Sequence, residues 1–192
     1  MKQIENVYKS FLQDCHEKNL RRKLIAIEPE KAGKIKVGGQ TYLNFASNDY
    51  LGLKHHPKLL EQSRKYGEKY GAGAGASRLV TGNTPLFGEI EQKIASLKGK
   101  QAALVLASGY QANGTVLQAL FDKTILKSTP TIVADKLNHA SMHFGCAAAG
   151  IRQKRYRHLD SDHAENLLSE TPADTSAFLL TETVFSMDGD IA

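Results

Sequence analysis

From residue 101 onward, apolar runs alternate with amphipathic stretches. Short apolar runs between turn residues predict β-strands, here over 102–107, 131–134, 151–156 and 177–180, the third more polar than the others. Apolar positions at helical spacing predict helices between them, over about 111–121, 140–149 and 162–170. Strands and helices that alternate with short links are typical of a parallel sheet with helices on its faces, so we predict a doubly wound α/β fold.

The first 45 residues follow different patterns. Residues 4–12 carry apolar side chains at helical spacing, which predicts an amphipathic helix, and the basic run 20–23 suits the C-terminal end of that helix by charge. Residues 34–37 and 41–45 alternate around Gly38-Gly39, which predicts a hairpin. We therefore expect a helical arm and hairpin over 1–45, and a partial large domain over 46–192.

A glycine-rich segment, residues 71–82, lies between two further predicted helices, 57–70 and 86–97, the second ending near Gly99. It holds four of the 16 glycines, so its backbone can adopt positive φ and approach another chain or a ligand closely. The segment lacks the spacing of a P-loop or a dinucleotide-binding motif, and it follows a helix rather than a strand. Those two nucleotide-binding classes are therefore excluded.

Charge is concentrated at one end of the chain. The 192 residues carry a net charge of +5, and the first 40 hold nine Lys/Arg against five Asp/Glu. The remainder is close to neutral and has no broad basic face, so we do not expect nucleic-acid binding through 21–23 or 152–157. The basic cluster 152–158 is interpreted as a solvated strand edge.

The expected location is the cytoplasm. No run of about 18 apolar residues is present, so no membrane association is expected, and the first 15 residues lack the apolar core of a secretory signal. Cys15 and Cys146 are the only cysteines, which excludes a disulfide framework and a four-cysteine zinc site.

Candidate chemistry gathers after the predicted strands, because ligands in open α/β sheets bind beyond the strands' carboxyl ends. Residues 108–110 follow the first strand and begin a helix, whose free N–H groups suit a phosphate. Asn138 and His139 follow Asp135 at the end of the second strand, and Glu182 and Ser186 follow the last. A phosphate site, an imidazole, a carboxylate and a hydroxyl are thus expected at one edge.

Three more specific motifs have less support in the sequence. His139 and His143 have the spacing of two metal ligands on a helix, but no third ligand accompanies them, so no metal is expected. Residues 107–109 do not form the nucleophile motif of a serine hydrolase. Asn113 matches a glycosylation acceptor, but it lies within a predicted helix.

Five separated motifs, in order, resemble the α-oxoamine synthases, pyridoxal-phosphate enzymes of the fold-type I aminotransferase group. They are NFASNDYLGL (44–53), the glycine-rich segment ending in ASRLVTG (76–82), ASGYQANG (107–114), LNHAS (137–141) and VFSMDGD (184–190). The resemblance implies a fold-type I, mostly parallel sheet with flanking helices. Within the family, the motifs are most similar to the 8-amino-7-oxononanoate synthase branch.

The resemblance implies a decarboxylative condensation of an amino acid with an acyl thioester. For that branch the substrates would be L-alanine and a pimeloyl thioester, carried on CoA or on acyl carrier protein, in biotin synthesis. Pyridoxal 5'-phosphate is the implied cofactor and electron sink. Gly109 and Tyr110 would bind its phosphate through backbone N–H groups, His139 would lie over its ring, and Ser186 would lie near the ring hydroxyl.

The resemblance also implies residues that bind substrate. His139 would contact it, and Arg21 matches an arginine that binds a substrate carboxylate, with Arg22 as an alternative. Asn48 and Glu182 fall inside matching motifs as supporting residues. Family members share active sites across a homodimer, so the glycine-rich segment is expected at a dimer interface.

Two departures from the family pattern matter. Phe87 replaces a histidine common in the family. The family's Schiff-base lysine, and the Asp and His that hold the cofactor ring, lie beyond the last motif, and Lys136 lies on the wrong motif to replace that lysine. We therefore expect the chain to be a truncated, inactive fragment. The alternatives are another α-oxoamine synthase, of the glycine C-acetyltransferase or serine palmitoyltransferase type, or a non-catalytic phosphate-binding or partner subunit.

Overall fold

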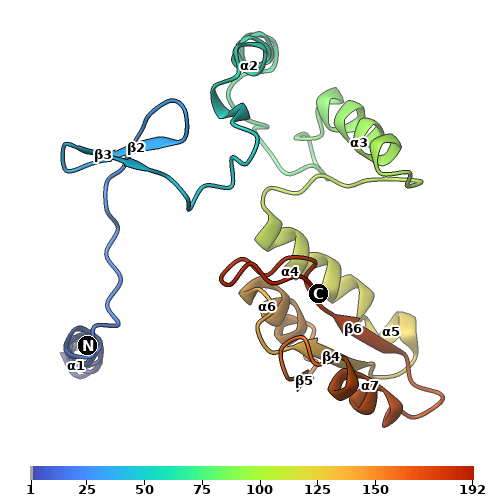
Figure 1. The fold of residues 1–192 in the computed structure, drawn as a ribbon. Helices are drawn as coiled ribbons and strands as arrows, with labels where there is room; N and C mark the ends of the chain where they lie inside the picture. Colours follow the sequence, from blue (N-terminus) through green and yellow to red (C-terminus); the bar gives the residue numbers. More distant parts are fainter. Residues whose placement is uncertain (1) are drawn as a thin grey trace. The chain divides into compact units, whose positions relative to one another are not determined.

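The structure, a computed structural model, describes residues 2–192, with side chains described from Ile4 onward. Its contacts divide the chain into two compact units, residues 1–84 and 85–192 (Figure 1). This division follows internal contacts, whereas the predicted division near residue 45 follows the change in hydrophobic pattern and stays a prediction.

Unit 1 (residues 1–84) consists of two longer helices and a small antiparallel sheet. Its elements are α1 (Lys2–Glu17), β1 (Glu28–Pro29), β2 (Lys34–Val37), β3 (Gln40–Leu43), η1 (Leu53–His55) and α2 (Pro57–Tyr70). The strands pair in the order β1-β2-β3, and the β2–β3 turn has Gly38 and Gly39 at φ 55° and 86°. The predicted amphipathic helix and hairpin are therefore confirmed.

The basic run 20–23 is not the end of α1, as the charge argument predicted. The helix ends at Glu17, and Asn19 adopts the left-handed region at φ 55°, which a continuing helix does not allow. The N–H groups of Leu20 and Arg21 both donate to the Cys15 carbonyl and close the helix end. Arg21 consequently lies in an irregular segment beyond the helix.

The glycine-rich segment uses its glycines as the sequence predicts. Gly71 and Gly75 have φ values of 83° and 73°, in the region that side-chain-bearing residues rarely adopt. At Gly82 a Cβ atom would stand 1.9 Å from the Ala76 carbonyl oxygen, so no other residue fits there without moving the backbone. The close approach is made within the segment itself.

Unit 2 (residues 85–192) is built around a three-stranded parallel sheet. Its elements are α3 (Pro85–Leu97), α4 (Gly109–Leu120), α5 (Lys123–Leu126), β4 (Thr131–Asp135), α6 (Ala140–Ala148), β5 (Gln153–Tyr156), α7 (Ser161–Ser169) and β6 (Ala177–Leu180). Strand β4 is central, in the order β5-β4-β6. The predicted helices are confirmed within a few residues, and α5 is an additional short helix.

Successive residues of β4 belong to two different hydrophobic clusters. Ile132 packs with Leu117 and Phe121 at the end of α4 and with Cys146 on α6. Val133 packs with Tyr156 on β5 and Ala164 on α7. Because successive side chains of a strand point to opposite faces, α4 and α6 cover one face of the sheet and α7 the other (Figure 1). This layering positions the carboxyl ends of the strands beside the starts of α4 and α6.

The prediction of a strand over 102–107 was wrong. This segment is extended but forms no ladder with any described strand, and Leu104 is 67% exposed. The Val105 N–H donates to the Glu91 carboxylate, 2.8 Å away, rather than to a neighbouring strand. An apolar run becomes a strand only where another strand can accept its backbone hydrogen bonds, and sequence pattern does not report that neighbour.

Candidate functional site

The N-terminus of α4 presents free backbone donors. Ser108 caps the helix, and its Oγ accepts from the Gln111 N–H at 3.1 Å, while the Gln111 side chain accepts from the Ala107 N–H at 3.2 Å. This reciprocal cap leaves the N–H groups of Gly109 and Tyr110 without an acceptor among the described residues. Two free donors at the positive end of a helix dipole form an anion site.

His139 lies at the N-terminus of α6, and its ring is held by the helix that it caps. Nδ1 accepts from the Ser141 N–H at 3.2 Å and lies 2.6 Å from the Ser141 hydroxyl, which accepts from Asn113 Nδ2 at 2.9 Å. Because Nδ1 acts as an acceptor, the proton of the neutral ring lies on Nε2. The α4–α6 contact therefore fixes both the orientation and the tautomer of His139.

Aromatic rings extend from His139 toward α4. The Tyr110 ring meets the His139 ring edge-on at a centroid distance of 6.2 Å and the Phe144 ring at 5.6 Å. Tyr110 and Phe144 are about half exposed. The free N–H groups at the start of α4 thus lie beside an accessible aromatic surface, because Tyr110 contributes to both.

Two side-chain contacts join the His139 loop to the end of β6. The Glu182 carboxylate accepts the His139 backbone N–H, and Asn138 Nδ2 donates to the Leu180 carbonyl at 2.9 Å. Glu182 therefore acts on His139 through the backbone. Its predicted supporting role in an enzyme stays a prediction.

Ser186 lies in a compact turn after β6. The Phe185 N–H donates to the Asp190 carbonyl, the Gly189 N–H donates to the Phe185 carbonyl, both at 2.9 Å, and Val184 pairs with Ile191. Ser186 itself is exposed. The predicted hydroxyl is therefore carried on a defined turn following the strand that bears Glu182.

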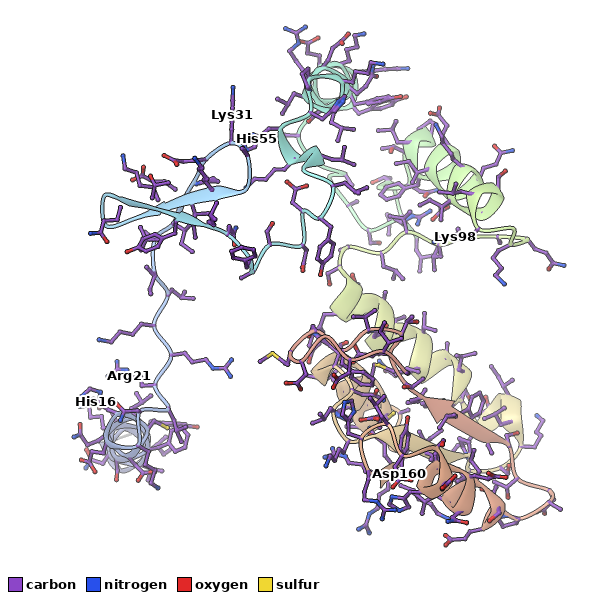
Figure 2. The ribbon with its side chains drawn as sticks, viewed as in Figure 1. His16, Arg21, Lys31, His55, Lys98 and Asp160 are labelled. Atoms are coloured by element: carbon purple, nitrogen blue, oxygen red, sulfur yellow. The ribbon has the colours of Figure 1, made fainter. Side chains whose placement is uncertain are left out.

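The other predicted residues lie elsewhere in the chain. Arg21 and Arg22 lie in the irregular segment after α1, where Figure 2 labels Arg21, and exposed Asn48 follows β3. All three belong to unit 1, so their expected participation stays a prediction. Lys136 is exposed on the loop after β4. Across the described residues, no group of three or more His, Cys, Asp or Glu could hold a metal ion.

One connected group of side chains at this edge was not predicted from the sequence. His158, which follows β5, bridges Asp135 and Asp190 with nitrogen–oxygen distances of 3.0 and 3.1 Å. The carboxyl-end rule applies to β5 as to the other strands and would have nominated His158. The basic residues before it led the whole run to be interpreted as a solvated edge.

The described residues fit pyridoxal phosphate. Gly109 and Tyr110 offer two unpaired N–H groups to a phosphate, and at Gly109 no atom lies within 4 Å of a Cβ position, so the backbone is open to a ligand. The His139 imidazole, with one nitrogen held by Ser141, leaves Nε2 and its ring face available. An anionic group and an aromatic ring can therefore be bound next to each other.

The geometry of this edge of the sheet is that of an α/β protein with free N–H donors for an anionic group beside an aromatic surface. Comparison with known protein families narrows that class. Residues 40–192 match the aminotransferase class I and II family, and the chain belongs to it. The predicted fold class, fold-type I with a parallel sheet and flanking helices, is confirmed.

Curated relatives cover the whole chain. An 8-amino-7-oxononanoate synthase of Gluconacetobacter diazotrophicus is 43% identical over an alignment of 195 positions, which covers 100% of this chain and 49% of the relative. A protein of Paramagnetospirillum magneticum, provisionally given the same name, is 47% identical over 192 residues, with the same coverage. The chain thus spans about half the length of the curated relatives it matches. These names confirm the α-oxoamine synthase resemblance.

Solved structures agree on the fold. A serine palmitoyltransferase from S. paucimobilis, with PLP and myriocin bound, superposes with a TM-score of 0.80 at 25% identity, covering 94% of this chain and 46% of that one. An 8-amino-7-oxononanoate synthase from Francisella tularensis superposes at 0.62 with 27% identity, covering 77% and 38%. The cofactor in the first structure is the one that the motifs imply.

The lengths and the apolar character of the helices bear on whether any of them could span a membrane. Within residues 2–192, none combines the length and apolar character required to cross a bilayer. The cytoplasmic location stays a prediction.

Proposed function

We propose that the full-length protein is a pyridoxal-phosphate-dependent acyltransferase that condenses an amino acid with an acyl thioester and releases carbon dioxide. The observation that carries this proposal is the fixed His139 ring beside the free N–H groups at the start of α4. In such enzymes the cofactor supplies a phosphate anchor and a conjugated ring that delocalises the electrons of a carbanion.

The chain's own residues would then bind, orient and donate. Gly109 and Tyr110 would donate backbone hydrogen bonds to the phosphate, where the helix dipole favours negative charge. His139 would lie over the ring with Nε2–H available as a donor, because Ser141 holds Nδ1. Ser186 would hydrogen-bond near the ring hydroxyl. A substrate carboxylate would be bound by Arg21.

The amino-acid and acyl substrates are proposed to be L-alanine and a pimeloyl thioester, as in the synthesis of 8-amino-7-oxononanoate for biotin. The identities of 43% and 47% to relatives of that name support this choice. The higher TM-score of the serine palmitoyltransferase favours the alternative pair, L-serine and a long-chain acyl thioester. Substrate pockets depend on side chains, so we give the sequence identity more weight than the backbone superposition.

The full-length protein is also proposed to be a homodimer whose glycine-rich segment lies at the subunit interface. Gly71 and Gly75 give that segment a backbone without obstructing side chains, which allows close contact between chains. Light scattering on the full-length protein measures its mass directly.

The proposal is tested by thiol release and product analysis on the full-length protein, with the pairs L-alanine and pimeloyl-CoA, L-serine and palmitoyl-CoA, and glycine and acetyl-CoA. The first pair should give the highest kcat/KM. Replacing His139 by Asn should lower kcat/KM by at least about 10²-fold, as expected for a positioned donor in the transition state.

His143→Asn is the matched control, because His143 lies one turn further along α6 and its ring contacts Gln153 at 2.8 Å. It should change kcat/KM by less than about threefold, as is usual away from the chemistry. Equal losses of kcat/KM in both variants would contradict the proposed role of His139. No turnover with any substrate pair would contradict the proposed reaction.

A further inference from the structure

A chain of three charged groups crosses the carboxyl edge of the sheet in unit 2. His158 Nδ1 lies 3.0 Å from an oxygen of Asp135, and Nε2 lies 3.1 Å from an oxygen of Asp190. The Asp135 side chain is fully buried, that of His158 is 16% exposed, and that of Asp190 is 41% exposed. The group therefore runs from the interior of the unit to its surface.

The two short contacts of the His158 ring suit its protonated form. Ionised carboxylates only accept hydrogen bonds, and a neutral imidazole carries a single N–H. Both contacts of His158 can therefore be hydrogen bonds only in the imidazolium form. In agreement, the hydrogen bonds to Asp135 and then to Asp190 raise the pKa of His158 above its ordinary value, against the opposing effect of burial.

Other titratable groups near His158 contact different partners. Arg157 Nε pairs with Asp160 at 2.6 Å, and the ring of His163 on α7 accepts the Arg157 N–H at 3.0 Å. Burial raises the pKa of the Tyr156 phenol, which lies close to Asp135. The titratable groups that face His158 are thus Asp135 from β4 and Asp190 from the turn after β6.

The turn that carries Ser186 is attached to this chain of groups at two points. The buried Phe185 ring meets the His158 ring edge-on at 4.5 Å, and Asp190 accepts from the same ring. Phe185 and Asp190 are also joined by a backbone hydrogen bond of 2.9 Å. Whatever holds the His158 ring therefore holds both ends of the segment that contains Ser186.

We propose that protonated His158 is a positioning residue that links buried Asp135 to Asp190 and so holds the 184–190 turn, with Ser186, at the carboxyl edge of the sheet. When the ring loses its proton, one N–H remains and stays with the buried Asp135, where water cannot replace it. The half-exposed Asp190 is released to solvent. We call this Asp135–His158–Asp190 link the latch. The His158–Asp190 hydrogen bond is therefore present below the pKa of His158 and is lost as pH rises through that pKa.

The latch itself is independent of cofactor and substrate; only its consequence for Ser186 rests on the proposed function. The first experiment accordingly uses the 192-residue chain without ligand. Long-range ¹H–¹⁵N NMR of the histidine rings measures the pKa and tautomer of His158, and hydrogen exchange measures the Phe185 and Gly189 amides. The variants are Asp190→Asn and, as matched control, Asp188→Asn in the same turn, whose exposed carboxylate has no partner in the described part of the chain.

Asp190→Asn should lower the pKa of His158 by at least about 0.5, because it removes one of two charged partners, and Asp188→Asn should leave it within about 0.2. Exchange of the two turn amides, corrected for intrinsic rates, should rise at least about threefold in Asp190→Asn and in the unmodified chain above the pKa of His158. Equal His158 pKa values in the two variants would contradict the proposal. So would hydrogen exchange of the two turn amides that does not change with the protonation of His158.

The second experiment uses the full-length protein with pyridoxal phosphate. Asp190→Asn should shift the pH dependence of the cofactor's visible absorption, and Asp188→Asn should not. If cofactor binds but the two variants behave alike, the positioning of Ser186 is wrong. If no cofactor binds, the proposed function fails while the latch measured without ligand stands.

Discussion

Asp135 ends the most buried strand of the sheet, and its carboxylate has no exposed surface. Burial favours the neutral form of the group, but hydrogen bonds from Leu137 N–H at 2.8 Å, Leu159 N–H at 3.0 Å and the His158 ring outweigh it and hold the pKa of Asp135 below its ordinary value. The same bonds hold Leu159 at a φ of 55°. One side chain therefore organises the loops after β4 and β5.

Replacing Asp135 by Asn should lower the free energy of unfolding by about 2–3 kcal/mol, because an amide NH₂ would then face a backbone or ring donor. A carboxylate whose pKa is lowered in the folded state stabilises the fold at pH values above the ordinary pKa of Asp, about 3.9. This contribution is lost as pH falls through the folded-state pKa. Urea unfolding should therefore show a shallower loss of stability below about pH 4 in the variant.

Asp174→Asn provides the control for that measurement, because Asp174 is exposed in the loop before β6. Its effect should stay within about 0.5 kcal/mol at neutral pH. If the two variants unfolded alike, the buried hydrogen-bond group at Asp135 would contribute nothing to stability.

Helices α4 and α6 pack closely enough that a side chain larger than glycine would be tight at their contact. A Cβ atom on Gly145 would stand 3.0 Å from the Leu117 Cβ and 3.1 Å from the Asn113 carbonyl oxygen, and one on Gly114 would meet the Phe144 ring at 3.2 Å. This approach lets Asn113 on α4 reach Ser141, which holds His139. The spacing of two helices thus controls the orientation of the imidazole.

Gly145→Ala should destabilise unit 2 by about 1–3 kcal/mol, the usual cost of overpacking a close contact. It should also separate α4 from α6, so the His139 ring signals should shift in NMR spectra. Gly88→Ala on α3 is the control, because no atom lies within 4 Å of a Cβ there, and it should leave stability unchanged or raise it by up to about 1 kcal/mol. A Gly145 variant as stable as the Gly88 variant would show that the helices can move apart freely.

At the scale of the whole chain, the two units differ in how they bury apolar side chains. Every buried hydrophobic residue of the described chain lies at Ala95 or beyond, whereas Leu24, Phe45 and Leu79 of unit 1 are 93% or more exposed. Unit 1 has helices and a hairpin but no core to support them. Since isolated helices and hairpins are marginal in water, its order depends on contacts outside the unit.

In the 192-residue chain alone, amides of residues 2–84 should therefore exchange within about tenfold of unstructured rates, whereas those of β4 should be slowed by at least about 10³-fold. Hydrogen exchange with mass spectrometry measures both regions in one sample. Protection of α2 comparable to that of β4 would contradict the difference, and β4 exchanging as fast as α2 would show that unit 2 lacks a stable core.

The amino-acid sequence alone determined most of the local structure and the chemistry. Sequence pattern located the longer helices, the two hairpin strands and three of the four strands predicted beyond residue 100, because period and length follow from backbone geometry and do not require a partner. The rule that ligands bind at the carboxyl ends of strands, with the motifs, nominated Gly109, Tyr110, His139 and Ser186.

Only the tertiary structure decided what depends on neighbours. It showed that 102–107 has no strand beside it, that Ser141 and Glu182 hold His139, and that His158 joins Asp135 to Asp190. The hydrogen-bonded pairs among these residues lie up to 43 positions apart in sequence. Hydrogen bonds across such separations arise from the packing of whole elements, which residue periodicity does not record.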